Sequence, residues 1–404
     1  MDLDLIRRLA VPNDTKILLA VVDGLGGLPH PETGRSELEA AQTTHLDRLA
    51  SESACGLTVP VGHGITPGSG PGHLALFGYD PLRYLVGRGV LEALGIDFDL
   101  QPHDVAARGN FCTLDAQGKI IDRRAGRPAD EQNVALCEKL RRIELPGVQL
   151  FVEPVREHRF VLVLRPDGPG ALSDQITETD PQRLGAAPLP AKPLAKVAKK
   201  TAELVNSFVE RARAHLNGSQ PANGLTLRGF AKQPSMPSFP ETFGLRAGAV
   251  AVYPMYRGLA KLVGMTALHT GSTYDDEIET LRTRWNEFDF FFVHYKPADS
   301  AGEDGDFERK MAALDAFDQA VPKLQELGAD VLMIAGDHST PAVLAGHSWH
   351  PVPFLLHSRW TARADDADAF TERACLRGSL GTLPACEVMP LAMAHAGRFT
   401  KYGA

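Results

Sequence analysis

Residues 17–27 read ILLAVVDGLGG, an uninterrupted apolar run that ends in an aspartate and a glycine-rich turn. Such a run is typical of a strand that is buried on both faces, as in a parallel sheet covered by helices. Asp23 then follows the strand at the edge where open α/β sheets bind ligands. The glycines after it let the backbone approach a bound group closely. Taken alone, Asp23 would be better interpreted as a carboxylate that caps a turn.

The α/β pattern continues on both sides of a differently patterned middle region. Helices are predicted from about residue 44, after Gly72 and near 91–94. From residue 248 strands and helices alternate, with strands at 248–253, 288–294, 330–335 and 352–356 and helices at 256–263 and 306–319.

Between these parts, segments such as NFCTLDAQGKIIDRR suggest a meander of strands. A Pro/Ala-rich loop (186–196) and a helix (197–215) follow, and NGSQPANG (217–224) is the predicted linker. We therefore predict an α/β protein. A three-layer α/β/α catalytic domain would comprise 1–103 and 221–404, with a smaller α+β domain inserted at 104–220. A cleft between two domains is a usual place for a small-molecule site.

Composition narrows the class of protein. A chain of 404 residues favours two domains, and 44% hydrophobic with 23% charged residues is typical of soluble globular proteins. The first apolar run is too short for a signal peptide or membrane span. Five scattered cysteines favour reduced thiols and a cytoplasmic protein. The net charge of −8 argues against nucleic-acid binding. Residues 101–220 carry 18 basic and 15 acidic side chains, which is either an adaptation to an anionic substrate or chance.

Three further motifs offer metal ligands at predicted strand ends or loops. VLMIAGDHSTP places Asp337 and His338 after an apolar strand, and GHSWHPVP places His347 in a loop. HYKPADSAGEDGD contains Asp299 and Glu303, which lie on one face if a helical turn begins there. An acidic solvated loop is the alternative for this last motif. Together with Asp23, these side chains suffice for two divalent cations, which indicates metal-assisted phosphoryl chemistry.

Ser69 in TPGSGPGH is the candidate nucleophile. A serine hydroxyl needs a base or a metal to react at neutral pH. The flanking glycines leave room for a phosphoryl group, and the helix predicted after them favours an anion at its N-terminus. The motif is neither a Walker A loop nor G-x-S-x-G, and without the metal ligands a flexible turn would be the better interpretation. His73 would orient this loop or cap the helix.

Basic residues are the candidates for gripping an anionic substrate, because arginine binds phosphate and carboxylate in a bidentate manner. The segment 122–127, DRRAGR, holds three arginines beside an aspartate, more than a solvated face requires. The complete set of candidates is Arg108, Arg123, Arg124, Arg127, Arg257, Lys261 and Lys296.

With these motifs assembled, the chain resembles the archaeal-type, cofactor-independent (2,3-bisphosphoglycerate-independent) phosphoglycerate mutases of the alkaline phosphatase superfamily. The resemblance covers nearly the whole chain. The motifs that carry it are VVDGLGGLPHP, ELEAAQTTHLDRLA, PGSGPGHLALFGYDPLRYLVGRGVLEALG, ARGNF, IIDRRAGR, EHRFVLVLR, YRGLAKLVGM, HYKPADSAGEDGD and GDHSTP with GHSWHPVP.

This resemblance implies two ions, one held by Asp23, Ser69, Asp337 and His338 and the other by Asp299, Glu303 and His347. It also implies that Ser69 accepts the phosphoryl group of 3-phosphoglycerate and returns it to the 2-hydroxyl, without bisphosphoglycerate. The insert would bind the carboxylate and exclude water. Many superfamily members have histidine where this chain has Glu303, and the extra oxygen ligand favours Mn or Mg over Co or Zn. Around Ser69, Gly70 and Pro71 replace an acidic and a hydroxyl residue of many archaeal relatives, which bears on how a phosphoserine is shielded.

Three other functions remain open from the sequence. A phosphomonoesterase would use the same groups with water as the acceptor, and a phosphotransferase would use another small alcohol. A silent metal-binding scaffold is disfavoured because Ser69 is retained together with the candidate ligands. Phosphoglycerate is the expected partner, with no nucleic acid and no membrane. The sequence gives no prediction of oligomeric state.

Overall fold

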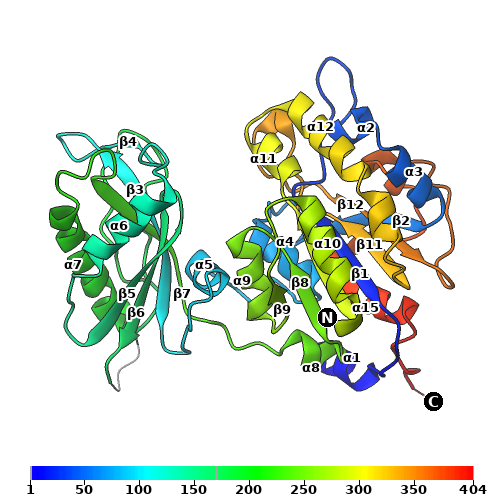
Figure 1. Ribbon diagram of the computed structural model, residues 1–404, viewed down its shortest axis with the longest axis horizontal. Coiled ribbons are helices and arrows are strands. Elements are labelled where there is room, and N and C mark those ends of the chain that lie inside the picture. The colour runs from blue at the N-terminus through cyan, green and yellow to red at the C-terminus, as the bar shows by residue number, and fades with distance from the viewer. Residues whose placement is uncertain (1, 169–171, 404) are drawn as a thin grey trace. The chain divides into compact units, whose positions relative to one another are not determined.

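The chain folds into two compact units (Figure 1), in a computed structural model that describes residues 2–168 and 172–403. The first unit combines the chain up to Leu85 with the chain from Met236 onward. The second comprises Val86–Ser235. The catalytic candidates Asp23, Ser69 and Asp337 therefore all belong to the first unit, although the second interrupts it in sequence.

The second unit extends beyond the predicted insert, 104–220, at both ends. Helix α5 (Arg88–Gly95) and strand β7 (Gly224–Ala231) both pack on strand β3 (Val105–Leu114), which brings them into this unit. The segment 217–224 is a turn that leads from helix α7 (Lys199–His215) into β7, and is not a linker between the units.

The first unit is built on an eight-stranded sheet with the order β13-β2-β12-β11-β1-β10-β8-β9. Strand β12 is antiparallel to both of its neighbours, β11 and β2, whereas the other neighbouring pairs are parallel. The strands are β1 (Ile17–Val22), β2 (Ala54–Val59), β8 (Ala247–Val250), β9 (Thr266–Leu268), β10 (Phe290–Tyr295), β11 (Val331–Ala335), β12 (Val352–Ser358) and β13 (Gly381–Pro384).

Strand β1 lies in the middle of this sheet, parallel to both β10 and β11. Val22 is in register with Tyr295, and Val21 with Ala335. The amide of Asp23 donates a hydrogen bond to the Tyr295 carbonyl at 2.9 Å. All six residues of β1 are buried, as the continuous apolar run predicted. The carboxyl ends of three strands consequently meet at one edge of the sheet.

Helices cover both faces of the sheet, which is thus the middle of three layers (Figure 1). On one face the core includes Leu18, Phe291 and Leu332, packed against α3 (Thr44–Ser51), α10 (Tyr274–Arg284), α12 (Phe307–Asp318) and α13 (Val321–Gln325). On the other face the ring of Phe292 lies 5.0 Å from that of Phe77 and the ring of Phe290 lies 4.8 Å from that of Phe239. The alternation of side chains along β10 separates these two cores.

The second face is covered by α4 (Ser69–Leu76), α8 (Phe239–Phe243), α9 (Pro254–Leu262) and α15 (Val388–His395). The remaining helices of this unit are α1 (Leu3–Leu9), α2 (Glu37–Ala40), α11 (Pro297–Glu303) and α14 (Glu372–Cys375).

Helix α4 begins at Ser69, whereas the sequence predicted a helix only after Gly72. Gly72 therefore lies inside the helix, where a Cβ atom would meet the Asp337 carbonyl oxygen at 2.1 Å. The glycine lets α4 approach the end of β11, and this contact brings Ser69 to the same sheet edge as Asp337.

The second unit is an α+β domain with an antiparallel five-stranded sheet. Its order is β4-β3-β6-β5, and β7 also pairs with β3. The further elements are β4 (Ile120–Asp122), β5 (Val148–Arg156), β6 (Arg159–Pro166) and α6 (Asp130–Leu140). Phe111 and Phe160, whose ring centroids are 4.7 Å apart, belong to a core that also holds Phe208 of α7.

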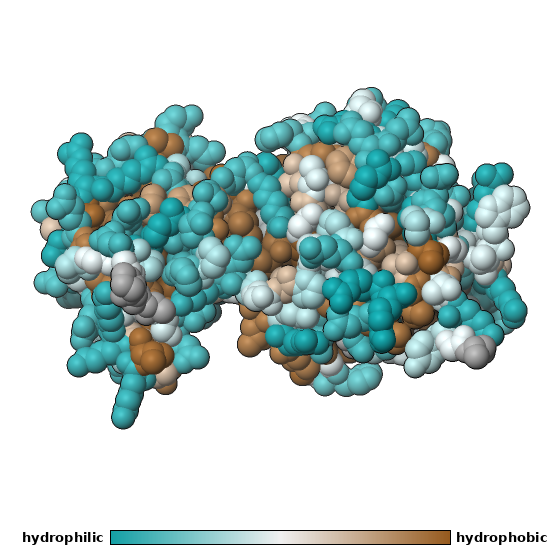
Figure 2. Space-filling model, turned by 90° about the horizontal axis from the view of Figure 1, so that it is seen from below, coloured by the Kyte–Doolittle hydropathy of each residue, from teal (hydrophilic) through white to brown (hydrophobic). Residues whose placement is uncertain are grey.

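Hydrophilic residues cover most of the surface seen in Figure 2, with apolar residues in scattered patches. Among the residues that the structure describes, no helix is both long and apolar enough to cross a membrane. The free thiols Cys55, Cys112, Cys137 and Cys375 are buried, and the fifth, Cys386, is half-buried.

Candidate active site at the carboxyl edge of the sheet

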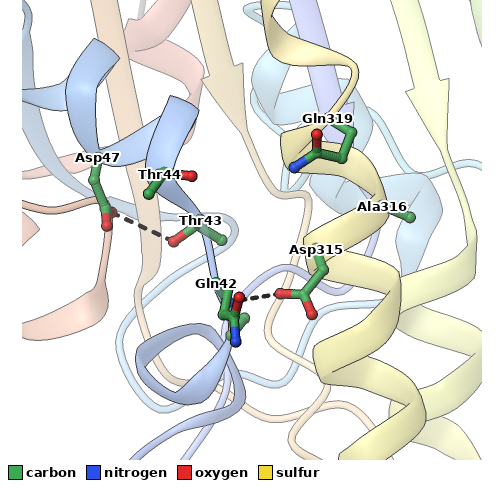
Figure 3. A pocket seen from close by; sticks show the side chains of 8 residues that line it. Gln42, Thr43, Thr44, Asp47, Asp315, Ala316 and Gln319 are labelled. Carbon is green, nitrogen blue, oxygen red and sulfur yellow. Dashed lines mark hydrogen bonds between the residues drawn. The ribbon is translucent and has the colours of Figure 1, made fainter.

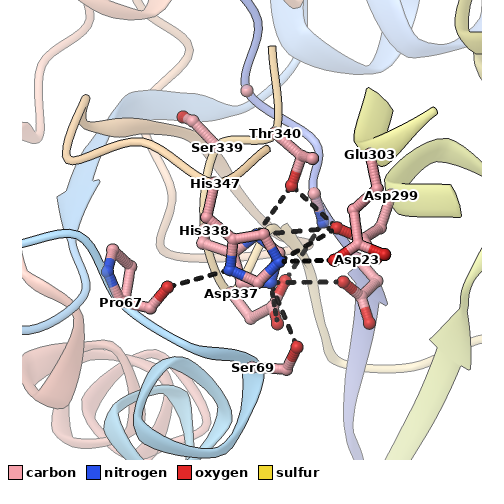
Figure 4. A network of polar contacts seen from close by, with 12 residues as sticks. Asp23, Pro67, Ser69, Asp299, Glu303, Asp337, His338, Ser339, Thr340 and His347 are labelled. Atoms are coloured by element: carbon pink, nitrogen blue, oxygen red, sulfur yellow. Dashed lines mark hydrogen bonds and ion pairs between the residues drawn. The ribbon is translucent and has the colours of Figure 1, made fainter. Parts of the chain in front are cut away.

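Asp23, Asp337 and His338 meet at the carboxyl edge, although they come from the ends of β1 and β11. Each is fully buried, and one ligand atom of each lies within 4.8 Å of the others. Figure 4 shows these side chains converging from the two loops. The sequence predicted that the ends of these two strands share one site. They do, because β1 and β11 are parallel neighbours in the sheet.

A second group contains Asp299, His338 and His347, whose ligand atoms also lie within 4.8 Å of one another. Asp299 is in the first turn of α11, which follows β10 directly. Glu303 lies one turn further on, with Oε1 3.5 Å from His347 Nε2 and 57% of its side chain exposed. His338 thus belongs to both groups, which the sequence did not indicate.

Hydrogen bonds at Nδ1 fix the orientation of the two histidine rings. His347 donates from Nδ1 to the Pro67 carbonyl at 2.9 Å. Thr340 donates its hydroxyl to Asp299 Oδ1 at 2.8 Å, so this hydroxyl accepts from His338 Nδ1, 2.9 Å away. Both rings therefore present Nε2 to the carboxylates. A backbone or side-chain acceptor at one ring nitrogen is the usual arrangement behind a metal-binding histidine.

Two carboxylate oxygens in the site indicate that the residues fit a cation. Asp23 Oδ1 and Asp337 Oδ2 are buried and accept no hydrogen bond. His338 Nε2 lies only 3.4 Å from the first and 3.1 Å from the second, but not with hydrogen-bond geometry. Buried carboxylate oxygens without a partner are strongly unfavourable unless a cation compensates them. The donor set, carboxylates with imidazole nitrogens, fits divalent metal ions.

Ser69 faces this cluster from the first turn of α4. Its side chain is almost buried, and Oγ lies 3.2 Å from His338 Nε2. His73, one turn later, donates from Nδ1 to the Ser69 carbonyl at 2.8 Å and lies 3.1 Å from Asp337 Oδ2. His73 therefore supports the serine, in agreement with the predicted orienting role. Gly68 at the N-cap offers no side chain, so the first amides of the helix remain available to an anion.

Two residues behind Asp23 were missed by sequence reasoning. Tyr256 of α9 donates its hydroxyl to Asp23 Oδ2, and His294 Nε2 donates to the same oxygen at 3.0 Å. Their rings are stacked with centroids 3.6 Å apart. The position of His294 at the end of the apolar run FDFFFVHY was a usable signal, since Asp23 and Asp337 were found in this way. Nothing in the helical segment around Tyr256 distinguishes it.

Lys296, predicted to contact substrate, lies among the carboxylates. Its ammonium group is 2.6 Å from Asp299 Oδ2, 3.0 Å from Asp23 Oδ2 and 2.9 Å from the Tyr256 hydroxyl. Burial would lower the pKa of Lys296, but Asp23 and the other neighbours hold it well above its usual value. The residue consequently neutralises part of the negative charge of the site.

The site carries an excess of negative charge. Burial would raise the pKa of Asp23, but Lys296 and the hydrogen bond from His294 hold it well below its usual value. Burial and Asp23 raise the pKa of Asp299, yet His347 and Lys296 outweigh them and bring it to about 2. Both carboxylates are therefore ionised. Burial lowers the pKa of His347, but Asp299 and Glu303 overcome this and raise it to about 10.

The predicted substrate residues Arg257 and Lys261 lie partly buried on α9, the helix that carries Tyr256. Burial lowers the pKa of Lys261. They belong to the first unit, whereas the other arginines belong to the second.

Arg108 lies on β3 of the second unit among other arginines. It is 8% exposed, and it pairs across the strands with Arg228 of β7, while Asn110 pairs with Arg159 of β6. The Nε atoms of Arg108, Arg159 and Arg228 are buried and donate no hydrogen bond. Burial, with only partial compensation by Glu92 3.6 Å away, lowers the pKa of Arg108 to about 10. The sequence had indicated only one member of this cluster.

The three arginines of the segment 122–127, predicted to include at least one anion-binding residue, lie in different surroundings. Arg123 donates to Asp180 at 2.9 Å, and Arg124 and Arg127 are exposed. The Asp122 carboxylate accepts from the amides of Arg124 and Gly126, which closes the turn. The aspartate beside the arginines is thus a turn residue, and Arg123 has a partner within the unit.

The fold and the site together define an α/β enzyme in which a serine faces two overlapping groups of candidate metal ligands. The sequence profile for 2,3-bisphosphoglycerate-independent phosphoglycerate mutase matches residues 50–223. The chain belongs to this family. A protein of Thermus thermophilus named as a probable member is 51% identical over 412 residues, covering 100% of both chains, and one of Aquifex aeolicus is 50% identical over 409 residues, again covering 100% of both.

Two solved structures extend the comparison. The cofactor-independent phosphoglycerate mutase of Thermoplasma acidophilum is 32% identical, with a TM-score of 0.68, over 95% of this chain and 100% of that one. A protein of Pyrococcus horikoshii gives a TM-score of 0.83 at 28% identity, over 97% of this chain and 100% of that one. The predicted family and α/β fold class are confirmed.

Proposed function

We propose that this chain interconverts 3-phosphoglycerate and 2-phosphoglycerate through a phosphoserine at Ser69, with two divalent cations and without bisphosphoglycerate. The observation that carries the proposal is the 3.2 Å distance from Ser69 Oγ to Nε2 of His338. This imidazole belongs to both candidate ligand groups, so the serine hydroxyl lies where a pair of ions would act on it. Family membership supports the choice of phosphoglycerate as substrate.

The proposed assignment keeps the two ligand sets given above, with Ser69 in the set of Asp23. When bound, the ions would lower the pKa of the serine hydroxyl and neutralise charge on the transferring phosphoryl group. The oxygen-rich second set, to which Glu303 contributes, favours Mn or Mg, with Co or Zn as alternatives.

The residues of the chain would perform the remaining steps. Ser69 Oγ would attack phosphorus, forming one O–P bond while the bond to the 3-oxygen of glycerate breaks, and the serine proton would end on that 3-oxygen. The first amides of α4 would hold the phosphoryl oxygens. After the glycerate has turned, its 2-hydroxyl would attack the phosphoserine, the bond between phosphorus and Ser69 Oγ would break, and the proton of the 2-hydroxyl would end on Oγ, which restores Ser69. Lys296, at hydrogen-bonding distance from both Asp23 and Asp299, would keep these two carboxylates in place.

We further propose that the second unit binds the glycerate carboxylate through Arg108, Arg159 and Arg228. Their buried Nε atoms, which donate no hydrogen bond, support this assignment. Charge-assisted hydrogen bonds to a carboxylate would satisfy them. Arg124 and Arg127, both exposed, remain proposed contacts, whereas Arg123 is engaged with Asp180. Arg257 and Lys261 would contribute from the first unit. We place the enzyme in the cytoplasm, with which the five free cysteines are consistent.

The test is an enolase-coupled assay on 3-phosphoglycerate with MnCl₂ and no bisphosphoglycerate, with free phosphate measured in parallel. Wild type should form 2-phosphoglycerate with little phosphate released, and Ser69→Ala should be inactive. Ser51→Ala, at an exposed serine of α3, is the matched control and should retain wild-type rates. Acid quenching during turnover should trap phosphate on Ser69. Release of phosphate without isomerisation would identify a phosphomonoesterase, and no turnover with Mn, Mg, Co or Zn would overturn the proposal.

A further inference from the structure

Lys310 is a fully buried lysine on α12, outside both groups of candidate metal ligands. Its ammonium group donates to the Gly26 carbonyl at 2.9 Å and to the Thr340 carbonyl at 2.9 Å. The Thr340 amide also donates to the Gly26 carbonyl, at 3.0 Å. The ammonium group thus lies where two loops touch. Packing between them is tight, because a Cβ atom on Gly26 would lie 1.9 Å from Ser339 Oγ.

These two loops carry ligands for both proposed ions. Gly26 follows Asp23 in the turn after β1, and Thr340 follows Asp337 and His338 in the turn after β11. The Thr340 hydroxyl connects the groups, since it contacts Asp299 Oδ1 at 2.8 Å and His338 Nδ1 at 2.9 Å (Figure 4). A displacement of Thr340 would therefore move ligands of both groups. Lys310 contacts the backbone of the loops and none of the ligands themselves.

A buried glutamate completes the arrangement around Lys310. Glu37 is fully buried, with Oε1 4.0 Å from the ammonium nitrogen. Oε1 accepts from the Ala342 amide at 2.6 Å, and Oε2 accepts from the Leu28 amide at 3.2 Å. Glu37 consequently bridges the same two loops just beyond the points that Lys310 holds.

Helix α12 does not depend on Lys310 for its position. At its other end Asp318 accepts from the Leu46 amide at 2.7 Å, and Asp315 accepts from the Gln42 amide at 2.6 Å. Figure 3 shows Asp315 beside Gln42. Both line a hollow of about 450 Å³ between α12 and the start of α3. The helix is therefore a fixed base from which Lys310 reaches the loops.

We infer that Lys310, together with Glu37, is a positioning pair of the metal centre that fixes the spacing between the Asp23 loop and the Asp337 loop. A lysine suits this role because its ammonium group donates to two carbonyls and also places a positive charge 4.0 Å from a carboxylate oxygen. Without it, the buried carbonyls of Gly26 and Thr340 would each lose a hydrogen bond, and the buried carboxylate of Glu37 would lose the positive charge beside it. The inference rests on the proposed two-metal function, and it adds residues that support both ions at once. Supporting residues behind ligands typically change metal affinity about 10–100-fold.

The experiment compares Lys310→Met, which keeps the length of the side chain and removes the ammonium group, with Lys323→Met. Lys323 lies on α13 in a surface ion pair with Asp275 and is the matched control. The metal-stripped chain is titrated with MnCl₂, and free Mn²⁺ is measured by electron paramagnetic resonance. Wild type and Lys323→Met should bind two ions alike, and Lys310→Met should bind both about tenfold or more weakly. In turnover, kcat of Lys310→Met should fall more than KM for 3-phosphoglycerate changes.

The outcomes separate the inference from the function on which it rests. If wild type binds no Mn²⁺, the proposed function itself fails. If wild type binds two ions and folded Lys310→Met, checked by circular dichroism in EDTA, binds them equally well, the inference is overturned.

Two further variants keep the inference testable. Glu37→Gln replaces Lys310→Met if the latter does not fold, and it too should weaken Mn²⁺ binding; an unchanged affinity would overturn the inference. The double variant Lys310→Met/Glu37→Gln removes both charges and should still bind Mn²⁺ more weakly than wild type. Recovery of wild-type affinity would overturn the inference, since it would mean that Lys310 only balances the charge of Glu37.

Discussion

The hydroxyl of Tyr256 donates a hydrogen bond to Oδ2 of Asp23, a residue 233 positions earlier in the chain. His294 and Lys296 contact the same carboxylate oxygen, each at 3.0 Å. Three neighbours therefore occupy Oδ2, while Oδ1 accepts no hydrogen bond and faces His338. This division orients the carboxylate, because only one of its two oxygens is available to a cation.

Tyr256→Phe should weaken Mn²⁺ binding and lower kcat by about tenfold, since the ring is kept while one hydrogen bond that orients Asp23 is lost. The measurements are Mn²⁺ titration and the coupled mutase assay. Tyr402→Phe, at a tyrosine that is 76% exposed, is the control and should behave as wild type. Wild-type affinity and kcat in Tyr256→Phe would mean that His294 and Lys296 suffice to orient Asp23.

Arg108→Met should raise KM for 3-phosphoglycerate by about tenfold or more, because a charge-assisted hydrogen bond is worth about 1.5–3 kcal/mol. Mn²⁺ binding should be unchanged, since Arg108 and the metal ligands belong to different units. Steady-state kinetics and metal titration check the two parts. The control Arg183→Met removes an exposed arginine of the same unit and should leave KM as in wild type. An unchanged KM in Arg108→Met would remove this arginine from the proposed carboxylate site.

Asp337→Asn should have opposite effects on stability with and without metal. In EDTA the variant should be more stable than wild type by about 1–3 kcal/mol, because Oδ2 of Asp337 is buried without a hydrogen bond. With MnCl₂ in excess, wild type should gain stability from binding and the variant much less. Urea unfolding measures the free energy of unfolding of wild type and of the variant, each in EDTA and with MnCl₂.

The matched control for this prediction is Asp368→Asn, at an aspartate whose side chain is 83% exposed. This control should have the same free energy of unfolding as wild type, both in EDTA and with MnCl₂. If Asp337→Asn is destabilised in EDTA, the carboxylate has a stabilising role of its own in the metal-free chain, and the interpretation of Oδ2 as a cation ligand loses its main support.

Glu277 should make the protein less stable as the pH rises. Its Oε1 accepts from the Val252 amide at 2.9 Å, while Oε2 is buried without a partner. Burial raises its pKa from 4.5 to about 9. Between these values the unfolded chain loses the proton that the folded chain keeps. Stability from this group is therefore full below pH 4.5 and is lost as the pH approaches 9, by at most about 1.4 kcal/mol per pH unit.

The check is the free energy of unfolding of wild type and Glu277→Gln at pH 5 and pH 8.5. The difference between the two proteins should move in favour of Glu277→Gln at the higher pH, since glutamine stays neutral. Glu279→Gln, on the same helix with a side chain that is 59% exposed, should show no such change. Parallel pH profiles for wild type and Glu277→Gln would contradict the prediction.

Much of the site followed from the sequence because of one local rule. An apolar run that ends in a polar residue predicts a buried strand with that residue at its end, and parallel strands bring their ends to one edge. The runs before Asp23 and Asp337 satisfied this rule, and glycines around Ser69 marked a close approach. The α/β class and the inserted α+β unit followed from the same periodicities. The ends of the insert did not, because α5 and β7 join it only through pairing and packing with β3.

By itself, then, the sequence determined the family, the fold class and the residues that can react, since each of these is written in short contiguous segments. The tertiary structure alone decided how those residues are held. Tyr256 reaches Asp23 from α9, Lys310 reaches both loops from α12, and Arg159 joins Arg108 from a neighbouring strand. These contacts join helices and strands distant in sequence, so no local pattern records them. They depend on the packing of the layers, which places buried polar groups where partners must be found.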